Sequence, residues 1–287
     1  MKAPAFRYLR ARSIAEACAM LAEHGGDARV IAGGQSLMPV LNMRLANPAA
    51  LIDINPIAEL TGIAIDGNTI RIGALTRYRD IEESPVVREH VGLIAQALPF
   101  IAHAAIRNRG TIGGSLATAD PAAEMPACCL ALDASMIIES ERGIRTVKAD
   151  DFFRSTFETA LAPDELLTAV EFPVQDATWR HGFAEFSRRR GDFAIVGAAL
   201  RARIDGRRIA EARFVMFGVG ERPVRITQAE SALLAQANIT DGILAAQAAL
   251  NSTLDPSCDN QTSAETRLHL ARVLLGRALA QFQDSVD

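Results

Sequence analysis

Lysine is nearly missing from this sequence of 287 residues: of its 30 basic residues only Lys2 and Lys148 are lysines. A mechanism that needs lysine would have two candidates, and neither lies in a motif. Aromatic residues make up only 5% of the chain, with one tryptophan, so stacking platforms for single-stranded nucleic acid are not expected. The net charge of −4 gives no general attraction to nucleic acid or to anionic lipid.

The sequence also has few cysteines and no long hydrophobic run. No cysteine pair has C-x-x-C spacing and the five histidines show no ligand spacing, so we expect no metal site on this chain. The longest weakly charged stretch, residues 93–106, is shorter than the ~20 apolar residues of a membrane-spanning helix. The N-terminus has no apolar core typical of a signal peptide. These features predict a reduced, cytoplasmic protein without a membrane span.

Apolar residues make up 49% of the chain and charged residues 22%, as in ordinary globular proteins. The length suggests about two domains. Ser13–Glu16 has the pattern of a capping box, so a helix should begin there and end at Gly25-Gly26. With short strands at 28–32 and 51–54 and a short helix at 40–45, residues 1–60 predict a small α/β lobe.

The next segment has the pattern of a second, antiparallel unit. Residues 63–72 alternate apolar side chains on both sides of Asp66-Gly67, which predicts a β-hairpin. Helical sequence follows between 78 and 105 and is broken by Pro85 and Pro99. We expect another helix at 126–132, and strands at 136–139, 144–147 and 166–172.

The pattern changes again at residues 173–178, where we place a domain boundary. Beyond it the sequence predicts strands at 183–186, 194–204 and 208–217, then helices at 228–236, 243–250 and 264–282. The predicted fold class is therefore α+β: a two-lobed domain at 1–176, with lobes at about 1–60 and 61–176, and a small C-terminal domain at 177–287.

Two glycine-containing segments, 30–37 and 110–116, resemble each other. Each runs from apolar residues into paired glycines and then into small polar residues. Glycine allows positive φ and the close approach of a ligand, and successive N–H groups in such a turn can bind an anion. A tight turn without a ligand is the alternative. Neither segment has the G-x-G-x-x-G, P-loop or nucleophile-elbow pattern.

A comparison of magnitudes favours one site that uses both segments. Desolvation of a phosphate costs several kcal/mol per charge. A hydrogen bond to a charged group returns roughly 1.5–3 kcal/mol. One turn offers two or three donors, so a pyrophosphate held without lysine would need both loops, with further donors from the side chains of Gln35, Ser36, Thr111 and Ser115.

Four motifs together resemble the FAD-binding medium subunits of the molybdenum hydroxylases, the family of carbon monoxide dehydrogenase and xanthine dehydrogenase. They follow one another at the separations that the family shows, and the resemblance covers essentially the whole chain. The motifs are Ala32–Leu37 with Arg44–Ala46 downstream, Arg107–Ala117, Asp120–Glu124 and Arg188–Ala194.

The resemblance implies a set of cofactor-binding residues. The two glycine loops would wrap the FAD pyrophosphate, Glu124 would contact the cofactor, and Leu167 would lie by the flavin, with Ile101 as a further candidate. Residues 183–187 lack the flavin-contacting lysine of some relatives. The loop residues in this set are Ala32, Gly33, Gly34, Gln35, Ser36, Leu37, Thr111, Ile112, Gly113, Gly114 and Ser115.

Other charged residues admit several interpretations. Asp120 and Glu124 fit a helix start or a ribose contact better than an acid–base pair. Arg188–Arg190 fit a solvated basic stretch, an anion site or a contact with a partner subunit. We therefore predict no catalytic side chain, which suits a protein whose redox chemistry belongs to its cofactor.

The predicted function is that of an electron-transfer subunit with non-covalent FAD, since neither loop has a histidine or cysteine to tether a flavin. The resemblance implies [2Fe–2S] clusters on a small subunit, the molybdenum cofactor on a large subunit, a dimer of such three-subunit units, and an external electron acceptor. The alternatives are a stand-alone FAD-dependent reductase or oxidase with a similar cofactor fold, and a non-enzymatic anion-binding scaffold.

Overall fold

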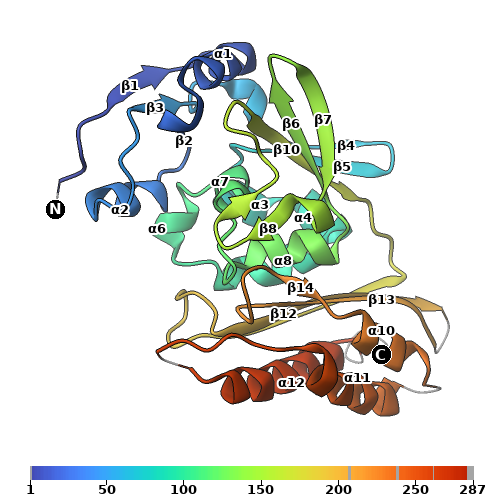
Figure 1. Cartoon of the computed structure of the whole chain (residues 1–287). Coiled ribbons are helices and arrows are strands. Elements are labelled where there is room, and N and C mark those ends of the chain that lie inside the picture. The colour runs from blue at the N-terminus through green and yellow to red at the C-terminus, as the bar shows by residue number, and fades with distance from the viewer. Residues whose placement is uncertain (1, 206–207, 237–238, 261, 283–287) are drawn as a thin grey trace.

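The computed structural model describes residues 2–205, 208–236, 239–260 and 262–282. Figure 1 shows three parts in chain order: an N-terminal lobe, a middle lobe and a C-terminal sheet with its helices. No helix among these residues is both long enough and apolar enough to cross a membrane.

The N-terminal lobe has a three-stranded parallel sheet with the strand order β1-β3-β2. The side chain of Ser13 accepts a hydrogen bond from the Glu16 N–H (3.1 Å), as the capping box predicts, and helix α1 packs Ala17, Cys18 and Leu21 into the core of this lobe. The elements are β1 (Arg7–Arg10), α1 (Ile14–His24), η1 (Gly25–Asp27), β2 (Ala28–Ile31), α2 (Leu37–Asn42), β3 (Ala50–Asp53) and η2 (Ala58–Leu60).

The middle lobe has a five-stranded antiparallel sheet with the order β4-β5-β10-β6-β7, and β10 lies at its centre. Helices cover this sheet. The strands are β4 (Ile63–Asp66), β5 (Thr69–Gly73), β6 (Ser135–Ser140), β7 (Gly143–Lys148), β10 (Leu166–Pro173) and the separate pair β8 (Phe153–Ser155) and β9 (Glu158–Thr159). The helices are α3 (Tyr78–Glu83), α4 (Pro85–His90), α5 (Gly92–Ala97), η3 (Leu98–Phe100), α6 (Ala104–Arg107), α7 (Ile112–Thr118), α8 (Glu124–Ala131) and α9 (Ala149–Phe152).

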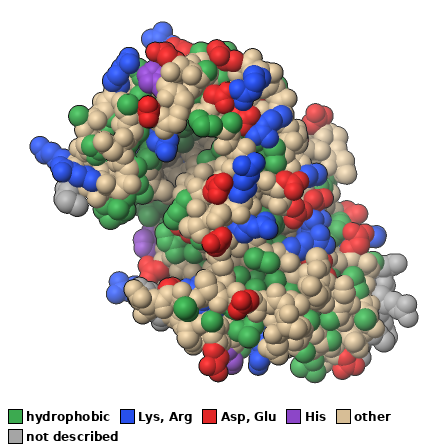
Figure 2. All heavy atoms as spheres, in the orientation of Figure 1, with side chains coloured by type: hydrophobic (Ala, Val, Ile, Leu, Met, Phe, Trp, Pro, Cys, Tyr) green, Lys and Arg blue, Asp and Glu red, His purple; other side chains and the backbone are tan. Residues whose placement is uncertain are grey.

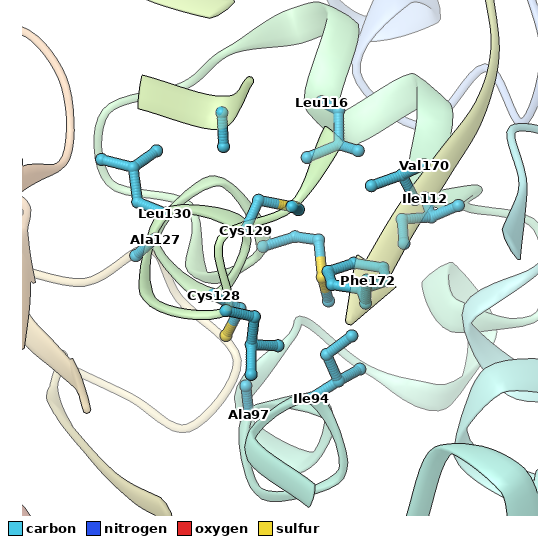
Figure 3. Packing of buried hydrophobic residues seen from close by; sticks show 14 of the residues in the cluster. Ile94, Ala97, Ile112, Leu116, Ala127, Cys128, Cys129, Leu130, Val170 and Phe172 are labelled. Atoms are coloured by element: carbon cyan, nitrogen blue, oxygen red, sulfur yellow. The ribbon is translucent and has the colours of Figure 1, made fainter. Parts of the chain in front are cut away.

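Helix α8 is buried along its whole length, so it forms the centre of this core. Figure 3 shows Cys128 and Cys129 of this helix among Ile94, Ile112 and Phe172. Burial raises the pKa of both thiols, so they stay protonated and behave as small apolar side chains.

The C-terminal part has a four-stranded antiparallel sheet, β11-β12-β13-β14, with helices on one face. The other face packs against the middle lobe: the rings of Phe183 and Phe100 lie 5.1 Å apart, and the Gly218 N–H donates to the Pro121 carbonyl (2.9 Å). The elements are β11 (Trp179–Phe186), β12 (Val196–Asp205), β13 (Arg208–Phe217), β14 (Val224–Arg225), α10 (Thr227–Leu234), α11 (Ile239–Thr253) and α12 (Ala264–Ala280).

Most predicted elements are present, but the short elements α7, α9, β8, β9 and β14 were not predicted and several others differ in extent. The hairpin pairs Ile63 with Ile72 and Asp66 with Thr69, as predicted. The helical stretch before residue 105 is a series of short helices, and Pro85 begins one of them because the first helical position needs no N–H donor. The helix expected at 40–45 is α2, which starts earlier, and strand β1 was not predicted because its four side chains are mostly exposed.

Candidate functional site

The two glycine loops lie directly against each other. The first loop follows β2, and the second leads into α7. A Cβ atom on Gly33 would collide with the backbone carbonyl of Arg109, so a side chain at this position would push the loops apart. Gly34 has a φ of +70°, in the left-handed region that favours glycine. In the first loop, Gly33 therefore allows this close approach and Gly34 allows the turn that follows it.

The first loop presents backbone N–H groups that no other group uses. Within the described chain, the N–H groups of Gly34, Gln35, Ser36 and Leu37 have no hydrogen-bond acceptor. The Ser36 side chain makes no capping hydrogen bond to α2, and that of Gln35 donates to the Gly33 carbonyl (2.9 Å). Successive free N–H groups in a turn form a concave site for an anion.

In the second loop, the Thr111 side chain and the N–H groups of Gly113 and Gly114 form hydrogen bonds within the protein. The side chain of Thr111 caps α7 by accepting a hydrogen bond from the Gly114 N–H (3.1 Å), and the Gly113 N–H donates to the Ala74 carbonyl (2.9 Å). A Cβ atom on Gly113 would lie only 2.5 Å from that of Ala74. Ile112 and Gly113 are buried, so they position the loop against the sheet.

An open cleft of about 320 Å³ lies between the start of the first loop, at Ala32 and Gly33, and the two residues that precede the second loop, Asn108 and Arg109. Figure 2 shows this face hollowed between the N-terminal lobe and the rest of the molecule. The Arg77 guanidinium donates to Asn55 Oδ1 (2.6 Å) and to the Arg109 carbonyl. The cleft is lined by Ala32, Gly33, Asn55, Arg77, Asn108 and Arg109.

The electrostatics of the cleft favour an anion. Burial lowers the pKa of Arg77, and the positive charge of Arg109 lowers it further. An anion between the two guanidinium groups would reverse this repulsion. Together with the free N–H groups, the cleft fits the diphosphate of a nucleotide cofactor such as FAD.

Four residues of this cleft were not among the predicted site residues. Asn55 lies just beyond β3 and next to the end of β2, because parallel strands end at the same edge of a sheet. A polar residue directly after a predicted strand could therefore have indicated this part of the site. Asn108 and Arg109 directly precede the second glycine loop and could have been chosen for that reason. No sequence pattern pointed to Arg77.

The structure places the other predicted residues at different depths. Ser115 lies within α7, four residues after the capping residue Thr111. Ile101 and Leu167 are 7% and 5% exposed and belong to the same buried cluster as Ile112. Glu124 begins α8 and is only 6% exposed. The second loop, Ile101, Leu167 and Glu124 thus belong to the middle lobe, whereas the first loop belongs to the N-terminal lobe.

Buried acidic and hydroxyl groups lie between the second loop and the C-terminal sheet. Burial raises the pKa of Glu124 to about 7, with a smaller effect from Asp120. Burial also raises the pKa of Glu185 to about 8, and the charge of Glu124 adds to this. The Tyr78 hydroxyl and both Glu185 carboxyl oxygens are buried, and the hydroxyl groups of Ser115 and Ser187 lie near the first and the second of these side chains. Glu185 lies in the segment that lacks the lysine of some relatives.

Two family models match the chain. The FAD-binding domain in molybdopterin dehydrogenase matches residues 4–175, and the C-terminal domain of the carbon monoxide dehydrogenase flavoprotein matches residues 181–282. The chain therefore belongs to the family of FAD-binding medium subunits of molybdenum hydroxylase-type oxidoreductases, as the sequence motifs predicted.

Individual relatives span the whole chain. The caffeine dehydrogenase subunit beta of a Pseudomonas species is 38% identical over all of this chain and 97% of its own length. Carbon monoxide dehydrogenase of Hydrogenophaga pseudoflava matches with a TM-score of 0.96 and 36% identity over 99% of both chains. Quinoline 2-oxidoreductase of Pseudomonas putida matches with a TM-score of 0.94 and 36% identity over all of both chains. The predicted fold class is confirmed.

Proposed function

We propose that this chain binds one non-covalent FAD, takes electrons from [2Fe–2S] clusters of a partner subunit and passes them to an external acceptor. The observation that carries the proposal is the cleft beside Gly33, which Arg77 and Arg109 line, together with the free N–H groups of residues 34–37 in the adjoining turn. Bound FAD supplies the redox chemistry, which this chain's side chains do not offer.

Each part of the site has a role in this proposal. The N–H groups of residues 34–37 donate to the pyrophosphate, and Arg77 and Arg109 neutralise its charge. The second loop, from Thr111 to Ser115, fixes the facing wall. Ile101 and Leu167 offer apolar surface to the flavin, and Glu124 offers a polar contact. Neither loop has a histidine or cysteine that could form a covalent flavin link.

The proposal includes the division of the chain and its partners. The FAD-binding domain would comprise residues 1–176 and the C-terminal domain residues 177–287. A small subunit would bring the clusters and a large subunit the molybdenum cofactor, in a cytoplasmic dimer of three-subunit units. The family supports this arrangement, since relatives are named as medium chains or subunits of carbon monoxide and glyceraldehyde dehydrogenases.

Reconstitution tests the proposal. The isolated chain should bind one FAD that acid precipitation releases, and none of the relatives' substrates, carbon monoxide, caffeine, nicotine or glyceraldehyde, should reduce this flavin. Adding the molybdenum and iron–sulfur subunits should restore flavin reduction by one substrate. Rapid reduction of the isolated chain by an organic or gaseous substrate would instead make it a stand-alone enzyme, and a colourless chain that binds no FAD would make it a scaffold.

A further inference from the structure

Asn55 connects the first glycine loop with an arginine of the middle lobe. Its side-chain Nδ2 donates to the Ala32 carbonyl at the start of the loop (2.9 Å) and to Asp53 Oδ1 (2.6 Å). Both amide protons are therefore used, and the amide cannot turn over without losing both bonds. This leaves Oδ1 of Asn55 to face Arg77, whose Nη2 donates to it (2.6 Å). One side chain thus fixes the loop and the guanidinium relative to each other.

A buried carboxylate holds this asparagine in place. Asp53, the last residue of β3, is 5% exposed, and its Oδ1 accepts from the backbone N–H of Asn55 (3.0 Å) as well as from its side chain. The Tyr8 hydroxyl of the neighbouring strand β1 donates to Oδ2 (2.5 Å). Burial alone would raise the pKa of Asp53, but the hydrogen bonds from Tyr8 and Asn55 lower it, so the carboxylate stays ionised at neutral pH. Hydrogen bonds to an ionised acceptor are stronger than neutral ones, so Asn55 is held firmly.

Arg77 keeps donors for a ligand. A guanidinium has five N–H bonds. Among the described residues, Arg77 donates only to Asn55 Oδ1 and to the Arg109 carbonyl, so three N–H bonds remain for an anion in the cleft that it lines. A guanidinium binds a phosphate best through two parallel N–H···O bonds, which require its plane to have one orientation. The two contacts with the protein supply this orientation.

We propose that Asp53 and Asn55 are positioning residues, which hold the Arg77 guanidinium and the first glycine loop in the arrangement that binds the FAD pyrophosphate. This inference rests on the proposed function. Asn55 lines the cleft but has no donor left for an anion, so it acts through Arg77 and the Ala32 carbonyl. Asp53 acts through Asn55. Because these groups are ordered before the cofactor arrives, less conformational freedom is lost on binding.

A double-mutant cycle on the isolated chain tests this inference, with the dissociation constant of FAD as the readout. N55A should weaken binding about tenfold in the wild-type background and by less than about threefold in R77Q, where only the contact with the loop remains to be lost. D53A should resemble N55A, whereas D53N keeps an oxygen for Asn55 and should retain most of the affinity. N68A, which removes an exposed asparagine from the turn between β4 and β5, should bind as the wild type.

The outcomes separate this inference from the proposed function. An unchanged affinity of N55A, or equal losses in the wild-type and R77Q backgrounds, would overturn the inference alone. Equal losses in D53N and D53A would overturn the role of Asp53. A wild-type chain that binds no FAD would overturn both the inference and the proposed function. If the variants do not fold, nitrogen-15 NMR of the FAD-free wild-type chain decides: separate signals of the two Nη atoms of Arg77 support a held guanidinium, and one averaged signal overturns it.

Discussion

The two glycine loops are similar in sequence and different in structure. The first leaves the N–H groups of residues 34–37 without acceptors, while the second uses Thr111 to cap α7 and binds Gly113 to the Ala74 carbonyl. Paired glycines followed by a hydroxyl residue thus serve two purposes. In the first loop they leave backbone donors without acceptors, and in the second they let a helix start against a sheet.

Substitution of Gly33 should have the largest effect on binding. In G33V the branched side chain meets the Arg109 carbonyl and separates the loops, so FAD affinity should fall about a hundredfold, or about 2.7 kcal/mol. Equilibrium titration monitored by flavin fluorescence measures this loss. G26V is the control, because a Cβ atom at Gly26 meets nothing within 4 Å. Equal affinities of the two variants would remove the first loop from the site.

The pH dependence of stability should show the burial of Glu124. Its pKa is raised from 4.5 to about 7 in the fold, so the folded chain holds a proton that the unfolded chain releases. The contribution of Glu124 to the free energy of unfolding of the FAD-free chain should be full below pH 4.5, and about 3 kcal/mol of it should be lost as the pH rises from 4.5 through 7.

Urea unfolding of E124Q from pH 5 to 8 checks this effect. The amide cannot ionise, so the variant should show a flatter profile than the wild type. An unchanged profile would mean that Glu124 does not titrate in this range.

Loss of one arginine should have an intermediate effect. R109Q removes a positive charge from the cleft, so FAD should bind about tenfold more weakly, or about 1.4 kcal/mol, and with a weaker dependence on salt. R154Q removes an exposed arginine that does not line the cleft and should leave affinity unchanged. Titrations at two salt concentrations distinguish these results, and identical affinities of R109Q and R154Q would contradict the anion site.

The smallest effect distinguishes the hydroxyl residues of the two loops. Thr111 caps a helix and Ser36 does not, so T111A should lower the free energy of unfolding by about 1 kcal/mol and S36A by less than 0.5 kcal/mol. Thermal unfolding of the FAD-free chain measures both. The reverse order would mean that the roles of the loops are exchanged.

Much of this molecule could be predicted from local patterns. The capping box at Ser13, the hairpin at Asp66-Gly67 and the helices after residue 226 depend on neighbours in the sequence, and each is present. The two glycine loops were also recognised, and the structure brings Gly33 of the first against the carbonyl of Arg109, just before the second.

The rest depends on contacts between distant segments. Arg77 lines the cleft because the turn after β5 places it against Asn55 and Arg109. No pattern in the sequence predicts these contacts. Glu185 is an ordinary acidic residue in the sequence, and only the tertiary structure shows that both of its carboxyl oxygens are buried. The different roles of the loops likewise follow from the position of Ala74, which lies far from Gly113 in the chain.

Amide hydrogen exchange of the isolated chain, with and without FAD, tests the central claim most directly. The N–H groups of residues 34–37 have no acceptor, so they should exchange rapidly without FAD and become strongly protected when it binds. Those of Gly113 and Gly114 already have acceptors and should change much less. Protection confined to the second loop, with residues 34–37 still exchanging rapidly, would contradict the assignment of the first loop to the pyrophosphate.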